Sequence, residues 1–132
     1  MEQGADIDKA ENTGATPLYI ASQEGHVDVV RVLVEQGADI NKAKNDGATP
    51  LHVASGKGCV DVVRVLLKQG ADINKATNTG ATPLFMASQQ GHVDVVRVLV
   101  EQGADIVKAM NDGFTPLLTA SCLLYTSPSP RD

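Results

Sequence analysis

Apolar and polar positions along this chain recur with one fixed period. A Gly-x-Thr-Pro-Leu motif begins at positions 14, 47, 80 and 113, so each copy starts 33 residues after the previous one. The apolar runs that follow the first three copies repeat at the same interval. An uninterrupted period of this length is typical of stacked repeats, which bury apolar surface between neighbouring units rather than around one central core. The pattern therefore predicts an array of similar units.

Each unit is predicted to begin with a short helix. In the unit that spans 13–45, Thr16 has the hydroxyl favoured at an N-cap, and Pro17 suits the first helical position. Gly25 can then end the helix in the left-handed conformation. These signals leave room for about two turns.

A second helix is predicted over 28–36, although the four valines of this run also suit a β-strand. Asp28 is favourable near the positive end of a helix dipole, and Gly37 stands where a C-terminal glycine belongs. The apolar residues cover a wide arc of this helix. We therefore expect it to be buried against a unit on each side.

The glycines support the same division of the chain. Gly56 is the exception among the 12 glycines, because all the others fall on three repeat positions. Glycine is favoured at positive φ and at helix ends. Three glycine positions in each unit therefore predict three reversals of the chain in each unit.

Charge and composition exclude several classes of function. The net charge is −5, with 11 basic and 16 acidic residues, and no basic stretch indicates binding to nucleic acid. The apolar runs are too short to cross a bilayer, so we expect no membrane insertion. Cys59 and Cys122 do not make a disulfide framework, which fits a reducing, intracellular and cytoplasmic setting.

Three kinds of motif carry a resemblance to a known family. They are Thr-Pro-Leu-His-Val-Ala at 49–54, Gly-His-Val-Asp-Val-Val at 25–30 and 91–96, and Gly-Ala-Asp-Ile-Asn at 37–41 and 70–74. With these motifs in register, the chain resembles the ankyrin repeat from residue 2 to about residue 121. The resemblance implies an all-α solenoid of stacked helix-turn-helix units with projecting β-hairpin loops and a concave groove. It also implies binding to other proteins and no shared catalytic activity.

One feature of the family pattern occurs only once. The histidine of the Thr-Pro-Leu-His motif is present as His52, whereas Tyr19, Phe85 and Leu118 stand at the corresponding positions. We expect His52 to lack the hydrogen-bonded ladder that the resemblance implies. Some rigidity would be lost there.

The period divides the chain into six segments. Three complete ankyrin repeats are predicted at 13–45, 46–78 and 79–111. Segment 1–12 is expected to be the end of a truncated preceding repeat, and 112–121 the start of another truncated repeat. Met1 occupies an apolar position of the repeat. We therefore expect the chain to be a fragment of a longer array.

Residues 122–132 depart from the repeat and are predicted to be a non-native tail. Their sequence, Cys-Leu-Leu-Tyr-Thr-Ser-Pro-Ser-Pro-Arg-Asp, resembles the translation of a transposase sequencing adaptor. Such a scar would have no part in the fold. The alternatives are a Ser-Pro phosphorylation tail and a proline-rich ligand for an aromatic groove.

One repeated position has two interpretations, a metal site and a structural role. His26, Cys59 and His92 share this position, and all three residue types can bind zinc. Helices stacked about 8–10 Å apart do not bring three such side chains within about 2.3 Å of one ion. No fourth ligand follows, so we predict a structural role and no metal.

Repeated hydroxyl groups do not indicate a catalytic nucleophile either. They stand at Ser22, Ser55, Ser88 and Ser121. None lies in a Gly-x-Ser-x-Gly elbow, and the sequence contains no phosphate loop or dinucleotide motif. We predict small packing residues here, with no catalytic residue and no cofactor.

Charged side chains recur on the second helix of each unit. Asp28 and Arg31 are predicted to form a solvated i,i+3 ion pair rather than part of a recognition patch, as are their equivalents. Glu35, Lys68 and Glu101 alternate in sign. We expect them to pair between adjacent units.

Positions that differ between units are free to specify a partner. The ankyrin resemblance places them at the loop tips and at the exposed end of each first helix. The predicted partner-binding residues are Glu11, Asn12, Thr13, Ala15, Gln23, Glu24, Lys44, Asn45, Asp46, Ala48, Gly56, Lys57, Thr77, Asn78, Thr79, Ala81, Gln89, Gln90, Met110, Asn111, Asp112 and Phe114. Gln, Asn and Thr dominate, and the set has no Tyr or Trp anchor.

The sequence thus predicts a non-enzymatic scaffold that binds a protein partner through a groove and its loop tips. The alternative is a regulatory or targeting segment of a larger enzyme, channel or ubiquitin-system protein. A structural tether, with no binding through the groove, is a third class. Catalytic motifs in flanking sequence would favour the second class, and further repeats would favour the first.

Overall fold

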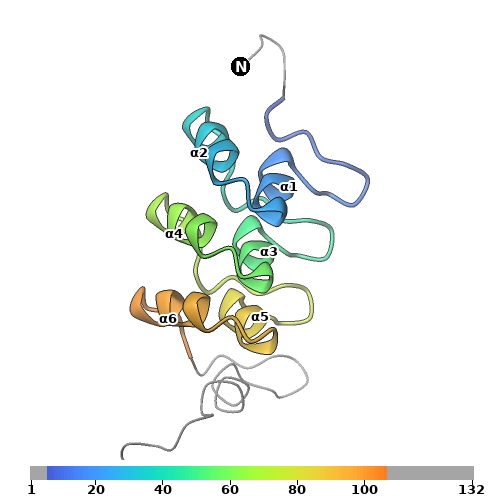
Figure 1. The fold of residues 1–132 in the computed structure, drawn as a ribbon. Coiled ribbons are helices and arrows are strands. Elements are labelled where there is room, and N and C mark those ends of the chain that lie inside the picture. Colours follow the sequence, from blue (N-terminus) through green and yellow to red (C-terminus); the bar gives the residue numbers. More distant parts are fainter. Residues whose placement is uncertain (1–5, 107–132) are drawn as a thin grey trace, which may run out of the picture.

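The computed structural model describes residues 6–106, which form two layers of short helices (Figure 1). The helices of this range are α1 (Pro17–Glu24), α2 (Val27–Glu35), α3 (Pro50–Lys57), α4 (Val60–Lys68), α5 (Pro83–Gln89) and α6 (Val93–Glu101). No β-strand occurs between residues 6 and 106. The all-α class is confirmed, and the valine-rich runs are helices.

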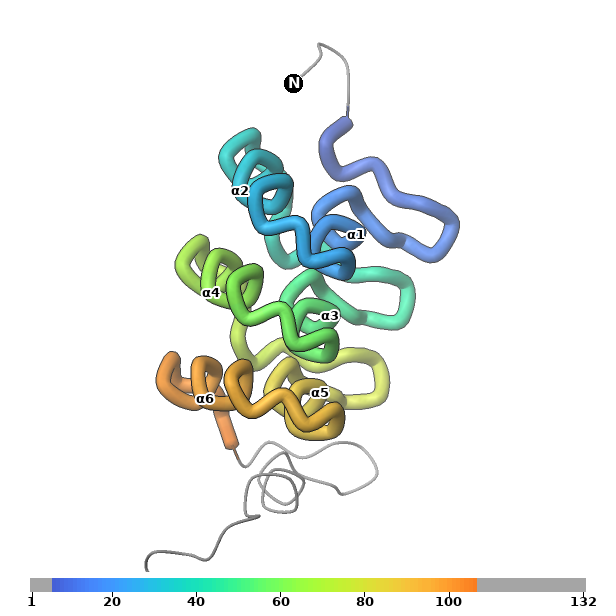
Figure 2. Tube along the Cα trace, viewed as in Figure 1, coloured from blue at the N-terminus to red at the C-terminus, as the bar shows by residue number. Residues whose placement is uncertain are grey.

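Each unit follows the same path, which is clear in the trace of Figure 2. A loop leads into the first helix, a tight turn reverses the chain, and the second helix returns beside the first. In one layer α3 packs between α1 and α5, and in the other α4 packs between α2 and α6. The described residues therefore form a solenoid in which each helix pair contacts its neighbours.

The first helices begin where threonine and proline predict. The Oγ1 atom of Thr16 accepts a hydrogen bond from the backbone N–H of Tyr19 at 3.2 Å. Thr49 and Thr82 cap α3 and α5 in the same way. Gly25 ends α1 with a left-handed φ of 74°. Both end signals of the first helix are confirmed.

The predicted reversals of the chain are also confirmed. Positive φ angles occur at Gly14, Gly25, Gly37, Gly47, Gly58, Gly70, Gly80, Gly91 and Gly103. These are the described glycines of the three repeat positions. Gly56, which lies off the pattern, is inside α3 and is not among them.

Burial of a second helix depends on the unit before it. Val29, Val62 and Val95 share one repeat position, yet their exposed fractions are 47%, 1% and 0%. The second helix of the preceding unit packs against each of the two helices with a buried valine at this position: α2 packs against α4, and α4 packs against α6. Because α4 also contacts the following helix α6, the expected burial on two sides is confirmed for α4.

The loops stack closely because glycine removes a side chain at the contact. Gly47 has a φ of +88°, and a Cβ atom added to it would lie 2.8 Å from the backbone nitrogen of Asn78. That nitrogen donates a hydrogen bond to the carbonyl of Asp46 at 2.9 Å. Gly14 has the same relation to Asn45 in the preceding pair of loops. Neighbouring loops are therefore held in contact through their backbones.

A second set of hydrogen bonds joins the start of each loop to the next unit. In each case a side-chain Oδ1 atom accepts a backbone N–H that lies 31 residues further along. The pairs are Asp8 with Asp39 (3.0 Å), Asn41 with Asp72 (2.9 Å) and Asn74 with Asp105 (2.8 Å). These bonds fix the register of the stack.

The described helix pairs fall within the predicted units 13–45, 46–78 and 79–111. The unit boundaries and the β-hairpin form of the loops stay predictions. The predictions for the partial unit 112–121 and the adaptor-like tail 122–132 lie outside the described residues, as does Met1.

Candidate binding face

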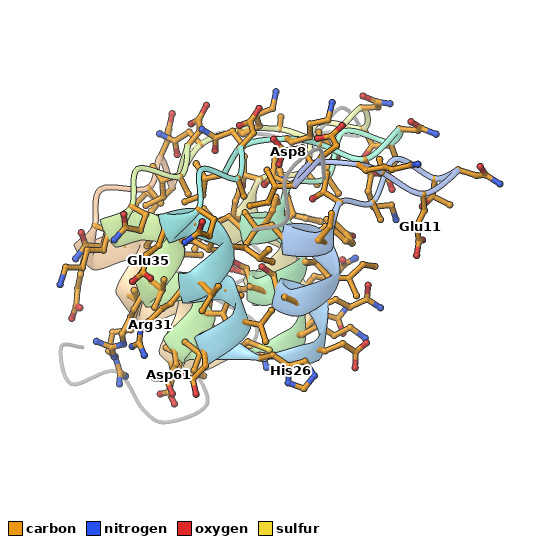
Figure 3. All side chains as sticks on the ribbon, turned by 90° about the horizontal axis from the view of Figure 1, so that it is seen from above. Asp8, Glu11, His26, Arg31, Glu35 and Asp61 are labelled. Carbon is orange, nitrogen blue, oxygen red and sulfur yellow. The ribbon has the colours of Figure 1, made fainter. Side chains whose placement is uncertain are left out.

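The candidate site lies on the face that α1, α3 and α5 form with the loops that precede them. We call this the loop-side face. Figure 3 shows Glu11 on a loop at one side of the molecule, with Arg31, Glu35 and Asp61 on the second-helix side. His26 lies at the turn between the two helices, away from the loops.

The predicted partner-binding residues differ in exposure. Those that are exposed are Glu11, Asn12, Thr13, Glu24, Asn45, Asp46, Lys57, Asn78, Thr79, Gln89 and Gln90. Those that are half-buried are Gln23, Lys44, Gly56 and Thr77. Those that are buried are Ala15, Ala48 and Ala81, each with at most 6% of its surface exposed. The last group lies outside the described residues: Met110, Asn111, Asp112 and Phe114.

Asparagine side chains at the loop tips hold neighbouring loops together. The amide Nδ2 of Asn45 donates to the carbonyl of Asn12 at 3.0 Å. Asn78 repeats this contact with the carbonyl of Asn45, also at 3.0 Å. These side chains are exposed to solvent, but their donors are already engaged within the stack. They position the loop tips for any partner.

A cavity of about 220 Å³ opens on the loop-side face. It is lined by Tyr19, Ala48, His52, Val53, Gly56, Lys57, Met86 and Gln90. All three first helices contribute to this lining. The structure thus brings together four of the predicted residues, Ala48, Gly56, Lys57 and Gln90, with four that sequence reasoning did not select.

An apolar row is the feature that sequence reasoning missed. Ile20, Val53 and Met86 share one repeat position and lie on α1, α3 and α5. Ile20 is 36% exposed, and the other two are half-buried. The sequence does contain a signal for this row, because the residue at this repeat position changes between units but stays apolar. The position lies inside the first helices, whereas the ankyrin resemblance points to the loop tips and the helix ends.

Lys44 and Tyr19 make a fixed contact beside the cavity. The Lys44 Nζ atom lies 5.1 Å from the centre of the Tyr19 ring and 3.9 Å from Asp46 Oδ2. Burial raises the pKa of the Tyr19 phenol, while the Lys44 charge opposes the shift. The phenol is therefore neutral at physiological pH, and its ring accepts a cation–π contact.

The expected loss of the His52 hydrogen bonds is wrong. The Nδ1 atom of this buried ring accepts the backbone N–H of Thr49 at 2.9 Å, and Nε2 donates to the carbonyl of Ala81 in the next unit at 3.0 Å. Both partners are backbone atoms, so the bonds do not require histidine in adjacent units. Burial lowers the pKa of His52, which favours the neutral ring that these bonds need.

At the repeated position of His26, Cys59 and His92, the latter two side chains lie close to the preceding unit, whereas His26 is exposed. His92 Nε2 lies 2.9 Å from the carbonyl oxygen of Gly56, and a Cβ atom added to Gly58 would be 2.6 Å from the His92 ring. Burial raises the pKa of the Cys59 thiol, which disfavours the reactive thiolate. Over residues 6–106 no three His, Cys, Asp or Glu side chains are grouped to hold a metal ion.

Only one of the predicted helix ion pairs forms within residues 6–106. Arg31 Nη1 lies 3.5 Å from Asp28 Oδ1, and both side chains are largely exposed. The equivalent pairs in α4 and α6 are not formed, and neither is the expected pairing of Lys68 with Glu35 or Glu101. Exposed ion pairs gain too little to offset the entropy of two long side chains.

Three of the four repeated serines lie in the described range, and Ser121 lies outside it. The hydroxyl oxygens of Ser22, Ser55 and Ser88 are buried and make no hydrogen bond in the described part of the chain. A nucleophile needs access to solvent and a neighbouring base. Their burial supports the packing role expected for them.

The fold and face described above define a helical repeat protein that presents a surface. The family model for ankyrin repeats (3 copies) matches residues 1–77 and 72–126, and the chain belongs to the ankyrin repeat family. Members of this family are generally protein–protein interaction modules and are typically non-catalytic. No curated protein matches the chain significantly. Among residues 6–106, no helix has both the length and the apolar character to cross a bilayer.

Proposed function

We propose that this chain is a non-enzymatic, cytoplasmic scaffold that binds a protein partner through its concave groove and loop tips. The observation that carries the proposal is the cavity on the loop-side face, where the apolar row meets exposed polar side chains. An apolar centre with a polar rim is the usual anatomy of a protein interface.

Preorganisation of the loops supports the same function. Backbone bonds from Asn45 to Thr13 and from Asn78 to Asp46 hold successive loops at 2.9 Å contacts. A loop that is ordered before binding loses less conformational entropy when a partner docks. The polar tips can therefore contribute to affinity and specificity despite the absence of Trp from the chain.

A regulatory segment of a larger enzyme, channel or ubiquitin-system protein would use the same face. What distinguishes the two classes is the activity of the connected domains, rather than the mode of binding. The tether class differs because it predicts no binding at the loop-side face.

Selection from a phage-displayed random peptide library on the full chain tests the proposal. A loop-side variant, Thr13→Glu with Thr79→Glu and Gln89→Glu, changes exposed predicted residues outside the cavity. The matched control is Gln36→Glu with Gln69→Glu and Gln102→Glu, which makes the same change in charge at exposed residues that directly follow the second helices. We expect selected peptides to lose binding to the first variant and to keep binding to the second.

Peptides that lose binding only to the control would place recognition on the second-helix side and contradict the proposal. Peptides that bind both variants like the unmodified chain would do the same. Circular dichroism of each variant checks that the helices are retained.

A further inference from the structure

Gly56 interrupts the repeat at the centre of the loop-side face. Gln23 and Gln89 stand at the same repeat position in the units on either side. Gly56 lies inside α3, where glycine is less favourable than other residues, and it does not have a positive φ. Its backbone conformation therefore gives no reason for glycine.

The position could instead accommodate a Cβ atom without a clash. A Cβ atom added to Gly56 would meet Met86 at 3.8 Å and 3.9 Å, which are ordinary van der Waals distances. Gly56 also lines the cavity of about 220 Å³. A glutamine at this position would extend into that cavity. The glycine thus creates a notch that the two neighbouring units lack.

The chemistry of the notch favours one apolar side chain. Tyr19, Val53 and Met86 supply its apolar surface, and the flexible thioether of methionine adapts to inserted groups. The cavity is smaller than the roughly 300–1,000 Å³ of small-molecule sites. Its size therefore fits a single inserted side chain better than a separate ligand.

Lys57 supplies the charge of this site. It is exposed, and it stands where Glu24 and Gln90 occur in the adjacent units. The other lining residues include no acidic group, and burial favours the neutral form of His52. A carboxylate on the partner would therefore meet a cation at the rim of the notch.

We propose that the Gly56 notch receives a leucine or methionine side chain of the protein partner, next to an aspartate or glutamate that pairs with Lys57. This inference rests on the proposed function, because it names the partner chemistry at the same face. It defines the partner as an acidic segment with one apolar anchor.

The test uses the peptides selected on the full chain. We expect them to share a leucine or methionine beside an acidic residue. The Gly56→Gln variant restores the side chain of the neighbouring units and should weaken binding at least about tenfold, the effect of losing one buried apolar side chain. Gln69→Ala changes an exposed glutamine that directly follows α4, outside the predicted partner-binding residues, and should leave binding unchanged.

Charge reversal gives an independent readout. Lys57→Glu should weaken the acidic peptides and strengthen versions in which the acid is replaced by lysine. Binding unaffected by both Gly56→Gln and Lys57→Glu, but lost with the loop-side variant, would overturn this inference and keep the proposed function. Binding unaffected by all of these variants would overturn both. Fluorescence anisotropy of labelled peptides measures each case.

Discussion

Gly47 and Gly70 have similar backbones and different surroundings. Their φ angles are 88° and 97°, so both occupy the left-handed region that side chains disfavour. A Cβ atom on Gly47 would collide with the next loop at 2.8 Å, whereas one on Gly70 would meet nothing within 4 Å. A comparison of these two glycines therefore separates the free-energy cost of backbone strain from the cost of a steric clash between loops.

We expect Gly70→Ala to lower the free energy of unfolding by roughly 1–2 kcal/mol, which is the cost of a left-handed alanine. Gly47→Ala should cost at least about 1 kcal/mol more, because the loop that carries Asn78 must also move. Urea denaturation of both variants measures the difference. Equal losses would show that close packing of the loops contributes nothing to stability.

His52 should make stability depend on pH. Burial places its pKa in the folded chain below the ordinary value of 6.5, so the unfolded chain binds the proton more readily. The stabilisation is present above about pH 6.5 and is lost as pH falls through the folded pKa. His52→Phe removes this dependence and copies the residue type of Phe85.

At about pH 7.5 the His52→Phe variant should be less stable by roughly 1–3 kcal/mol, because Thr49 and Ala81 lose their partners. The gap between the two proteins should narrow towards about pH 5. Unfolding free energies of both proteins at the two pH values give the comparison. A constant gap would mean that protonation of this ring is not linked to folding.

At the scale of elements, identical helices are buried differently. α2 and α6 have the same sequence, Val-Asp-Val-Val-Arg-Val-Leu-Val-Glu. Only Val30 is buried in α2, whereas Val95, Val96, Val98 and Leu99 are buried in α6. Neighbouring helices, rather than sequence alone, therefore determine how much surface each helix buries.

Val62→Ala and Val29→Ala test this dependence at one repeat position. Val62 is 1% exposed and Val29 is 47% exposed. We expect Val62→Ala to cost roughly 2 kcal/mol and Val29→Ala less than about 1 kcal/mol. Thermal unfolding followed by circular dichroism reports both. A larger loss at Val29 would contradict the packing order of α2 and α4.

The helices were predictable because their signals are local. Thr16 and Pro17 begin α1 and Gly25 ends it, and these residues act within one turn. The cavity was not predictable in this way, since Tyr19 on α1 and Met86 on α5 come to line one cavity only after the units have stacked. The His52 bond to Ala81 likewise joins residues 29 positions apart. The repeat period predicts that the units stack but does not predict these contacts.

At the scale of the whole molecule, stability should vary along the stack. α2 has one buried residue, and α4 has three, Val62, Val63 and Leu66. Repeat arrays are stabilised by nearest-neighbour interfaces and can open locally. We expect amide hydrogens of α2 to exchange faster than those of α4, as measured by hydrogen–deuterium exchange. Equal protection would indicate that all units open together.

Asp8, Asn41 and Asn74 accept hydrogen bonds from backbone N–H groups that lie 31 residues later in the chain. This spacing limits how such a chain can change length. Each donor and acceptor belong to adjacent units, so duplication of one full unit recreates both partners at the new junction. Insertion of any other length separates the acceptor from the donor in the bond that spans the insertion. Growth or loss by whole 33-residue units is therefore the change in gene length that this architecture accommodates most readily.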